Sequence, residues 1–291
     1  MYYLFRLAAI LVPRIPYRLI PPLSRVIGWF AWLLAFGARK QVEENITHIL
    51  QARNSGAIVE RREVQRKTQG VFCNSARNYL EAFYTPQRSE ESIVSVAHIE
   101  SIDPLKEALA HGHGVILFSA HLGPFELLAH WLSINGYRTI VPVENLKDKR
   151  LLDLMLRLRR SHGIEFIPLG GSAPMRVMTQ ALRANQIVLI TADRVIQGQS
   201  IEFPFFGTKT QLPGGIVRLA QKTGAALVGG FGWWTDETHI QCKLVPLSLT
   251  FSEEELKQVE VVQQGIVNQM ETFIGEHPEQ WVVLSRIWTK N

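Results

Sequence analysis

The sequence predicts an α/β protein in which helices flank a mostly parallel central sheet, with a helical region at the N-terminus. Two observations lead to this fold class. Short apolar runs bounded by glycine alternate with amphipathic segments from residue 103 onward, which is typical of strand–helix units. Ahead of them, residues 1–42 are apolar and carry six cationic side chains and no acidic one, which sets this end of the chain apart.

Composition is that of a folded protein. The chain has 291 residues, 46% of them apolar and 20% charged, which excludes a disordered chain and provides for a sizeable core. Cys73 and Cys242 form no spacing pattern, so neither a disulfide framework nor a cysteine metal site is expected, and a reducing compartment fits best. We predict an N-terminal segment, 1–38, and a domain, 39–291, that is helical over 39–84 and α/β over 103–291.

The basic charge belongs to the N-terminal segment. Residues 1–42 have a charge of +6, whereas the whole chain has a net charge of +5. The other residues therefore sum to −1. Within this segment the longest uncharged run, 26–38, has 13 residues, whereas a membrane-spanning helix needs about 20. We therefore expect residues 1–38 to lie in an anionic membrane surface, with arginines at the head groups. A tilted span, or a helical cap packed on the protein's own core, are the alternatives.

Each later element follows from a local pattern. Asp103 and Pro104 open the first helix of the α/β part, Pro124 opens another, and Gly163 and Gly224 close two more. Residues 85–102 are read as the passage between the helical and the α/β parts. Strands are predicted at 114–120, 137–143, 164–169, 187–193, 225–234 and 239–247. Helices are predicted at 103–112, 124–136, 147–163, 173–186, 214–224 and 252–276.

One stretch, "FSAHLGPFE" (118–126), combines a strand end with chemistry. Ligands of parallel sheets bind beyond the carboxyl ends of the strands, and His121 follows such an end. Glu126 lies in the first turn of the next helix, so the intervening corner can bring its carboxylate to the imidazole. That pairing would make His121 a general base toward a hydroxyl. Since no G-x-S-x-G elbow is present, the hydroxyl would belong to the substrate.

Two other interpretations of this stretch stay open. His121 can be a hydrogen-bonded histidine at a strand end, with Glu126 as a solvated acid that suits the helix dipole. Glu126, His130 and His121 can also be weighed as metal ligands, although no H-E-x-x-H motif is present.

The same stretch also resembles a motif of a known protein family. His121 to Glu126 resembles the H-x(4)-D/E motif of the lysophospholipid acyltransferase superfamily. Within it, the lipid A biosynthesis late acyltransferases (lauroyl and myristoyl) and the phosphatidylinositol mannoside acyltransferases are most similar. Five segments match in order over about residues 39–288: "RKQVEENITHIL", "GVILFSAHLGPFE", "LRLRRSHG", "TADRVIQGQSIEFPFFGTKTQLPGGIVRLAQKTGAALV" and "HPEQWVVLSRIW". The Gly-Pro at 123–124 departs from the usual Gly-Asn.

The resemblance implies transfer of an acyl group from acyl-CoA or acyl carrier protein to a hydroxyl of a membrane glycolipid. His121 would be the base and Glu126 would hold its imidazolium. Arg159 is the first candidate donor to the oxyanion, and Asp193 ends a strand on the ligand side. Arg194 and Lys209 are candidates for phosphate contacts. The expected acyl-chain lining comprises Phe118, Phe125, Leu127 and Trp131, whereas Trp281 and Arg286 are expected to be structural, in a C-terminal helix.

The resemblance also sets expectations about partners and place. No metal and no cofactor beyond the acyl donor is expected, and no nucleic-acid partner. The expected location is the cytoplasmic face of a bacterial plasma (inner) membrane. Two other functions remain: a non-catalytic lipid-binding membrane protein on the same fold, and a metal-dependent hydrolase.

Overall fold

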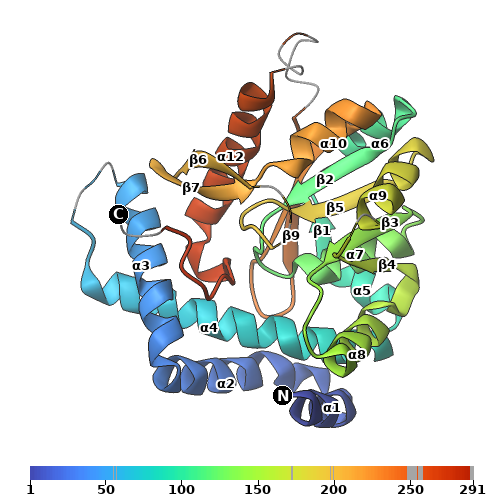
Figure 1. Cartoon of the computed structure of the whole chain (residues 1–291). Coiled ribbons are helices and arrows are strands. Elements are labelled where there is room, and N and C mark those ends of the chain that lie inside the picture. The colour runs from blue at the N-terminus through green and yellow to red at the C-terminus, as the bar shows by residue number, and fades with distance from the viewer. Residues whose placement is uncertain are drawn as a thin grey trace.

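The computed structural model describes residues 1–288, apart from 55, 57, 172, 197, 199, 248–253 and 255–257. A seven-stranded sheet forms its centre, and a layer of N-terminal helices lies across one end of it (Figure 1). The strands of this sheet are β1 (Ala97–Ile99), β2 (Val115–Ser119), β3 (Thr139–Val143), β4 (Glu165–Pro168), β5 (Ile187–Thr191), β8 (Ala226–Trp234) and β9 (Ile240–Pro246).

The sheet is mostly parallel, as predicted. Its strand order is β1-β9-β8-β2-β5-β3-β4, and all neighbouring pairs are parallel except β8 with β9. The chain thus enters β2 at the centre and returns to the centre with β5 after visiting the β3–β4 edge. Because β2 and β5 run side by side in the same direction, their carboxyl ends meet at one edge.

Helices cover both faces because the central strands are buried on both. In β2, Ile116 and Phe118 face one core and Val115 and Leu117 face the other, the alternation that a strand imposes. The first core is closed by α9 (Ala173–Arg183), α10 (Gly215–Thr223) and α12 (Val259–Glu276). The second is closed by α6 (Asp103–Ala110), α7 (Phe125–Ile134) and α8 (Lys149–Arg159).

Three local features differ from the sequence-based prediction. Residues 85–102 contain a short helix, α5 (Glu90–Val96), and the edge strand β1. A second, two-stranded sheet is formed by β6 (Ser200–Phe205) and β7 (Thr208–Pro213), which no pattern predicted. The C-terminal segment after α12 is a 3₁₀ turn, η6 (Pro278–Gln280), and not a helix. The predicted start of the helix 252–276 lies largely outside the described residues.

The N-terminal layer is helical throughout. It comprises α1 (Tyr2–Leu11), η1 (Val12–Arg14), η2 (Tyr17–Leu19), α2 (Ile20–Leu34), α3 (Phe36–Arg53) and α4 (Arg61–Tyr84), which η3 (Thr85–Gln87) extends. Figure 1 shows α4 between α2 and the sheet. Val12 and Ile20 are buried with Leu80 and Phe83 of α4, so one side of the segment packs on the protein.

The other side of this layer is apolar and exposed. Of the 17 large hydrophobic side chains that are exposed in the described part of the chain, 14 lie within residues 1–36. Taken singly, none of the described helices has the length and apolarity that a membrane crossing requires. By length and composition alone, the bent pair Tyr17–Leu34 and Phe36–Arg53, with 101° between its halves, would qualify.

Candidate active site

The register of two central strands brings His121 and Asp193 together. Ser119 of β2 pairs with Thr191 of β5, each the last residue of its strand. His121 and Asp193 therefore both lie two residues beyond the same edge of the sheet. One more backbone hydrogen bond, from Ala192 N to Ser119 O at 2.8 Å, continues the ladder past the strand ends. Adjacent strand ends thus present a histidine and a carboxylate to each other.

A hydrogen bond joins the two side chains. His121 Nδ1 lies 2.8 Å from Asp193 Oδ1. The carboxylate can only accept, so Nδ1 carries the proton of this bond and the neutral ring presents Nε2 as a free base. The His121 side chain is 14% exposed and Asp193 is fully buried, so the ring faces the cavity and the carboxylate lies behind it.

Asp193 is held in place by the C-terminal segment. Its Oδ2 accepts from Trp281 Nε1 at 2.7 Å and from the backbone N–H of His121 at 3.1 Å. Burial alone would raise the pKa of Asp193, but the nearby His121 and these hydrogen bonds outweigh it, so the pKa lies below the usual range. The carboxylate therefore stays ionised at neutral pH. Trp281, expected to be only structural, is a positioning residue of this site.

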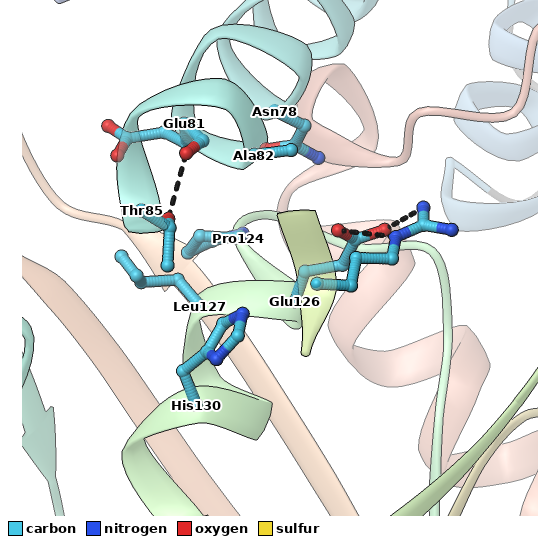
Figure 2. Close-up of a pocket in the computed structure, with 9 residues that line it drawn as sticks. Asn78, Glu81, Ala82, Thr85, Pro124, Glu126, Leu127 and His130 are labelled. Atoms are coloured by element: carbon cyan, nitrogen blue, oxygen red, sulfur yellow. Dashed lines mark hydrogen bonds and ion pairs between the residues drawn. The ribbon is translucent and has the colours of Figure 1, made fainter. Parts of the chain in front are cut away.

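Glu126 makes no hydrogen bond or ion pair with the imidazole, whose Nδ1 is paired with Asp193, and the structure thus corrects the prediction that Glu126 holds His121. It receives two hydrogen bonds from Arg159 of α8, one of them from Nε to Oε2 at 3.1 Å (Figure 2). The first turn of α7 directs the carboxylate toward α8, where a guanidinium matches it with two parallel bonds. Burial would lower the pKa of Arg159, but the charge of Glu126 and its hydrogen bonds raise it.

These groups line one cavity of about 400 Å³. His121, Glu126, Arg159 and Arg194 contribute to its polar wall. Much of the remaining wall is apolar, and its apolar side chains from α7, α8, β3, β4 and β5 are Phe125, Ala129, Val141, Val143, Leu151, Met155, Phe166 and Leu189. The cavity thus joins a histidine–carboxylate pair to an apolar chamber.

Comparison with known proteins assigns the family. The description "Bacterial lipid A biosynthesis acyltransferase" belongs to the family that matches residues 1–290. The chain belongs to this acyltransferase family. Two curated relatives are phosphatidylinositol mannoside acyltransferases of Mycobacterium tuberculosis: strain H37Rv at 31% identity and strain CDC 1551 at 29%, each over 227 residues. A third, from Mycolicibacterium smegmatis, is 28% identical over 219 residues. Each match covers 75% of this chain and 70% of the relative. The resemblance of the motifs to both of these acyltransferase families is thereby confirmed.

Of the two predicted phosphate contacts of this acyltransferase, Arg194 lines the cavity and Lys209 does not. Arg194 lines the cavity beside Glu144, its Nη2 lying 3.6 Å from Glu144 Oε2, and its buried Nε makes no hydrogen bond. Lys209 is not brought to the cavity. It lies on β7, is 72% exposed and pairs with Glu202 across the hairpin.

Only one of the four expected acyl-chain residues lines the main cavity. Phe125 does so, and its ring lies edge-on to His121 with 5.3 Å between centroids. Phe118 is fully buried core, and Leu127 borders a small cavity beneath Glu126. Trp131 lines a third, small apolar cavity that Phe125 and Leu189 separate from the main one.

The small cavity beneath Glu126 contains a buried histidine. Figure 2 shows the His130 ring there, close to Leu127 and Pro124. Burial lowers the pKa of His130 to about 4, so the ring is neutral at pH 7, and its buried Nδ1 makes no hydrogen bond. Within the described part of the chain, no three or more His, Cys, Asp and Glu side chains lie together in a group that could hold a metal ion. Glu126 instead pairs with Arg159.

Proposed function

We propose that this acyltransferase moves a fatty acyl group from an acyl thioester, acyl-CoA or acyl carrier protein, to a hydroxyl of a membrane glycolipid. The observation that carries the proposal is the His121–Asp193 pair at the wall of a cavity that is otherwise largely apolar. A base beside an apolar chamber suits a reaction that joins a long acyl chain to a polar hydroxyl.

The histidine supplies the base. Nε2 of His121 takes the proton of the acceptor hydroxyl as its oxygen attacks the thioester carbonyl carbon. The tetrahedral intermediate then collapses, the carbon–sulfur bond breaks, and the departing thiolate takes the proton back from the imidazolium. Asp193 keeps Nδ1 protonated before the reaction and stabilises the imidazolium during it, because its charge lies 2.8 Å from Nδ1.

Arg159 is the proposed donor to the oxyanion. Glu126 occupies two of the five N–H donors of this guanidinium and fixes its plane on the cavity wall. The remaining donors are free to stabilise a developing negative charge. Glu126 then acts through Arg159 and not through His121. The histidine of the H-x(4)-E motif is thus the base, and its glutamate positions the oxyanion donor. Arg194, with its unbonded buried Nε, is the proposed contact for phosphate or sugar oxygens of a substrate.

The apolar part of the cavity is proposed to receive the acyl chain. Val141, Met155 and Phe166 line it on the side toward β3, β4 and α8. Phe5 of α1 and Met1, which precedes this helix, also line the same cavity, so the exposed apolar face of the N-terminal layer is continuous with its wall. A lipid substrate could reach the cavity from a bilayer on this side.

The test of this function is direct transfer. Purified protein is incubated with radiolabelled palmitoyl-CoA, or with palmitoyl carrier protein, and a bacterial glycolipid extract. Labelled lipid that mild alkali hydrolyses, as an ester requires, is the expected product. Mass spectrometry of glycolipids from cells with and without the gene then identifies the acceptor. If no thioester donor supports labelling of any glycolipid, while free fatty acid is released, the protein is a hydrolase.

Membrane association is the second part of the proposal. The arginines of residues 1–38 and the exposed side chains Trp29, Phe30 and Leu33 suit an anionic bilayer surface on the cytoplasmic side. Deleting the segment would also expose Leu80 and Phe83, so a milder change is needed. We expect Trp29→Gln with Phe30→Gln to lower binding to phosphatidylglycerol vesicles about tenfold or more, since two partly inserted aromatic rings are lost.

The matched control replaces exposed apolar residues elsewhere. Ile58→Gln with Met175→Gln removes side chains that are 98% and 44% exposed and lie outside residues 1–38. Vesicle flotation should leave this double variant bound like the wild type. Equal binding of all three proteins would show that the N-terminal layer does not dock on the bilayer.

A further inference from the structure

A second large cavity lies on the opposite side of α4 from the active site. The groove has a volume of about 480 Å³ and is formed by α2, α4 and the end of β8 with the turn that follows. Its α4 residues include Arg66, Gly70, Cys73 and Arg77, at helical spacings of four, three and four. The residues of α4 at the His121 cavity, Ser75, Asn78, Tyr79 and Ala82, project from the other face at 100° per residue.

This groove is built around guanidinium groups. Arg25 of α2 and Arg66 and Arg77 of α4 all line it. Arg77 is 7% exposed and its guanidinium carbon lies 3.3 Å from the ring centre of Trp234. Its Nη2 donates to the carbonyl oxygen of Glu237, and its Nε lies 3.7 Å from Glu81 Oε1 in an ion pair. Arg66 is exposed and has no ion pair with another described residue. The buried Arg77 thus forms the base of the groove, and the exposed guanidinium of Arg66 lies at the same groove with donors that suit a phosphate oxygen.

The two acidic residues that line the groove, Asp236 and Glu237, already have partners. Asp236 Oδ1 accepts from the backbone N–H groups of Thr238 and His239 within the β8–β9 turn, at 2.6 and 2.8 Å. Glu237 pairs with Arg25, and the two side chains are 56% and 61% exposed. Exposed ion pairs contribute little to stability, so a bound anion can take Arg25 from Glu237 at low cost.

The groove also adjoins the apolar face of α2. Arg25 precedes Trp29 by one helical turn, and Val26, Trp29 and Phe30 are all about half exposed. In Figure 1 this helix runs along α4 on the side away from the sheet. A phosphate bound at Arg25 and Arg66 would thus lie at the boundary between a polar groove and an exposed apolar surface, which is where a lipid head group meets its acyl chains.

We propose that this groove binds the phosphate group of an anionic glycerophospholipid whose acyl chains lie along Val26, Trp29 and Phe30. The site is distinct from the acyl-transfer cavity, since α4 separates them, and the bound lipid is not the acyl acceptor. The inference rests on the proposed membrane association and is independent of acyl transfer. Inorganic phosphate shares the recognised group, so the experiment below separates the two sources.

The probe is dihexanoyl phosphatidylglycerol below its critical micelle concentration, titrated calorimetrically into the full-length protein. Binding should be the same for wild type and for His121→Ala, which separates this site from catalysis. Arg66→Gln should weaken binding about tenfold, the loss expected for one charge-assisted hydrogen bond, and Arg25→Gln should act similarly. Arg61→Gln is the matched control, because Arg61 is an exposed cation at the start of α4 and does not line the groove.

The outcomes divide clearly. Binding of phosphatidylglycerol that exceeds that of sodium phosphate about tenfold supports a lipid head group as the source. Equal binding of sodium phosphate, still weakened by Arg66→Gln, supports the phosphate site with the free anion as its source. The proposal is overturned if the double variant Arg25→Gln with Arg66→Gln still binds phosphatidylglycerol like the wild type. It is also overturned if Arg61→Gln weakens this binding as much as Arg66→Gln does. Acyl transfer by the Arg66→Gln protein, measured with detergent-dispersed acceptor, reports on the proposed function separately.

Discussion

His121→Ala is expected to lower kcat for acyl transfer by about 10⁴-fold, because the variant has no group that can take the proton of the acceptor hydroxyl. KM for the acyl donor should change little, since the ring forms only a small part of a cavity of about 400 Å³. Radiolabelled ester formation under single-turnover conditions measures the effect on the chemical step.

Two controls separate loss of the base from loss of the fold. The alanine variant leaves Asp193 buried with two of its three donors, Trp281 Nε1 and the backbone N–H at 121. His121→Gln should be equally inactive, since an amide is not a base at neutral pH. A melting temperature like that of the wild type would show that the loss of activity does not come from unfolding. Added imidazole should partly restore the alanine variant, because the vacated space opens on the cavity. An alanine variant that turns over at the wild-type rate would eliminate His121 as the base.

The sequence predicts the fold better than it predicts the contacts of the site. Apolar runs predict six of the seven strands of the central sheet, all but β1, and the rule about carboxyl ends places His121 and Asp193 on one side of the sheet. Their adjacency depends on strand order. The chain passes through β3 and β4 between β2 and β5, and no local pattern shows that β5 then lies beside β2.

Sequence distance explains why Glu126 was chosen as the partner of His121. It lies five residues away, whereas Asp193 is 72 away and Trp281 is a further 88 from Asp193. The choice was wrong because the first turn of α7 directs Glu126 toward Arg159. Strand register could have corrected it: once β2 and β5 are taken as neighbours, Ser119 opposite Thr191 places both residues two positions past the edge.

The β6–β7 hairpin was missed for a different reason. Its turn residues are Phe206 and Gly207, both with positive φ (49° and 75°), where Asn-Gly is the usual signal. Tertiary contacts hold the phenylalanine in this conformation. Glu271 accepts from its backbone N–H, and a ring nitrogen of His48 lies 3.0 Å from its carbonyl oxygen. A turn that depends on α3 and α12 leaves no local pattern to read.

Asp193→Asn is expected to lower kcat by about 10³- to 10⁴-fold with the fold intact, because it imposes the wrong tautomer on His121. Trp281 Nε1 and the backbone N–H of His121 both donate to Oδ2, so the amide oxygen of an asparagine must occupy that position. Its NH₂ group then replaces Oδ1, 2.8 Å from Nδ1. An NH₂ group can only donate, so Nδ1 accepts, the ring proton moves to Nε2, and the free base is lost.

Glu126→Gln is the matched control, because it neutralises a carboxylate that lines the cavity and leaves the His121–Asp193 bond in place. It should hold Arg159 less firmly and so weaken stabilisation of the oxyanion, which is expected to lower kcat about 10- to 10²-fold. This loss is well below the one expected for Asp193→Asn. Nitrogen-15 NMR of labelled histidine reports the tautomer independently of activity: protonated Nδ1 in wild type and Glu126→Gln, protonated Nε2 in Asp193→Asn. If Glu126→Gln shifted the proton while Asp193→Asn did not, Glu126 would be the partner of His121, and the catalytic pair would be the one that sequence proximity suggested.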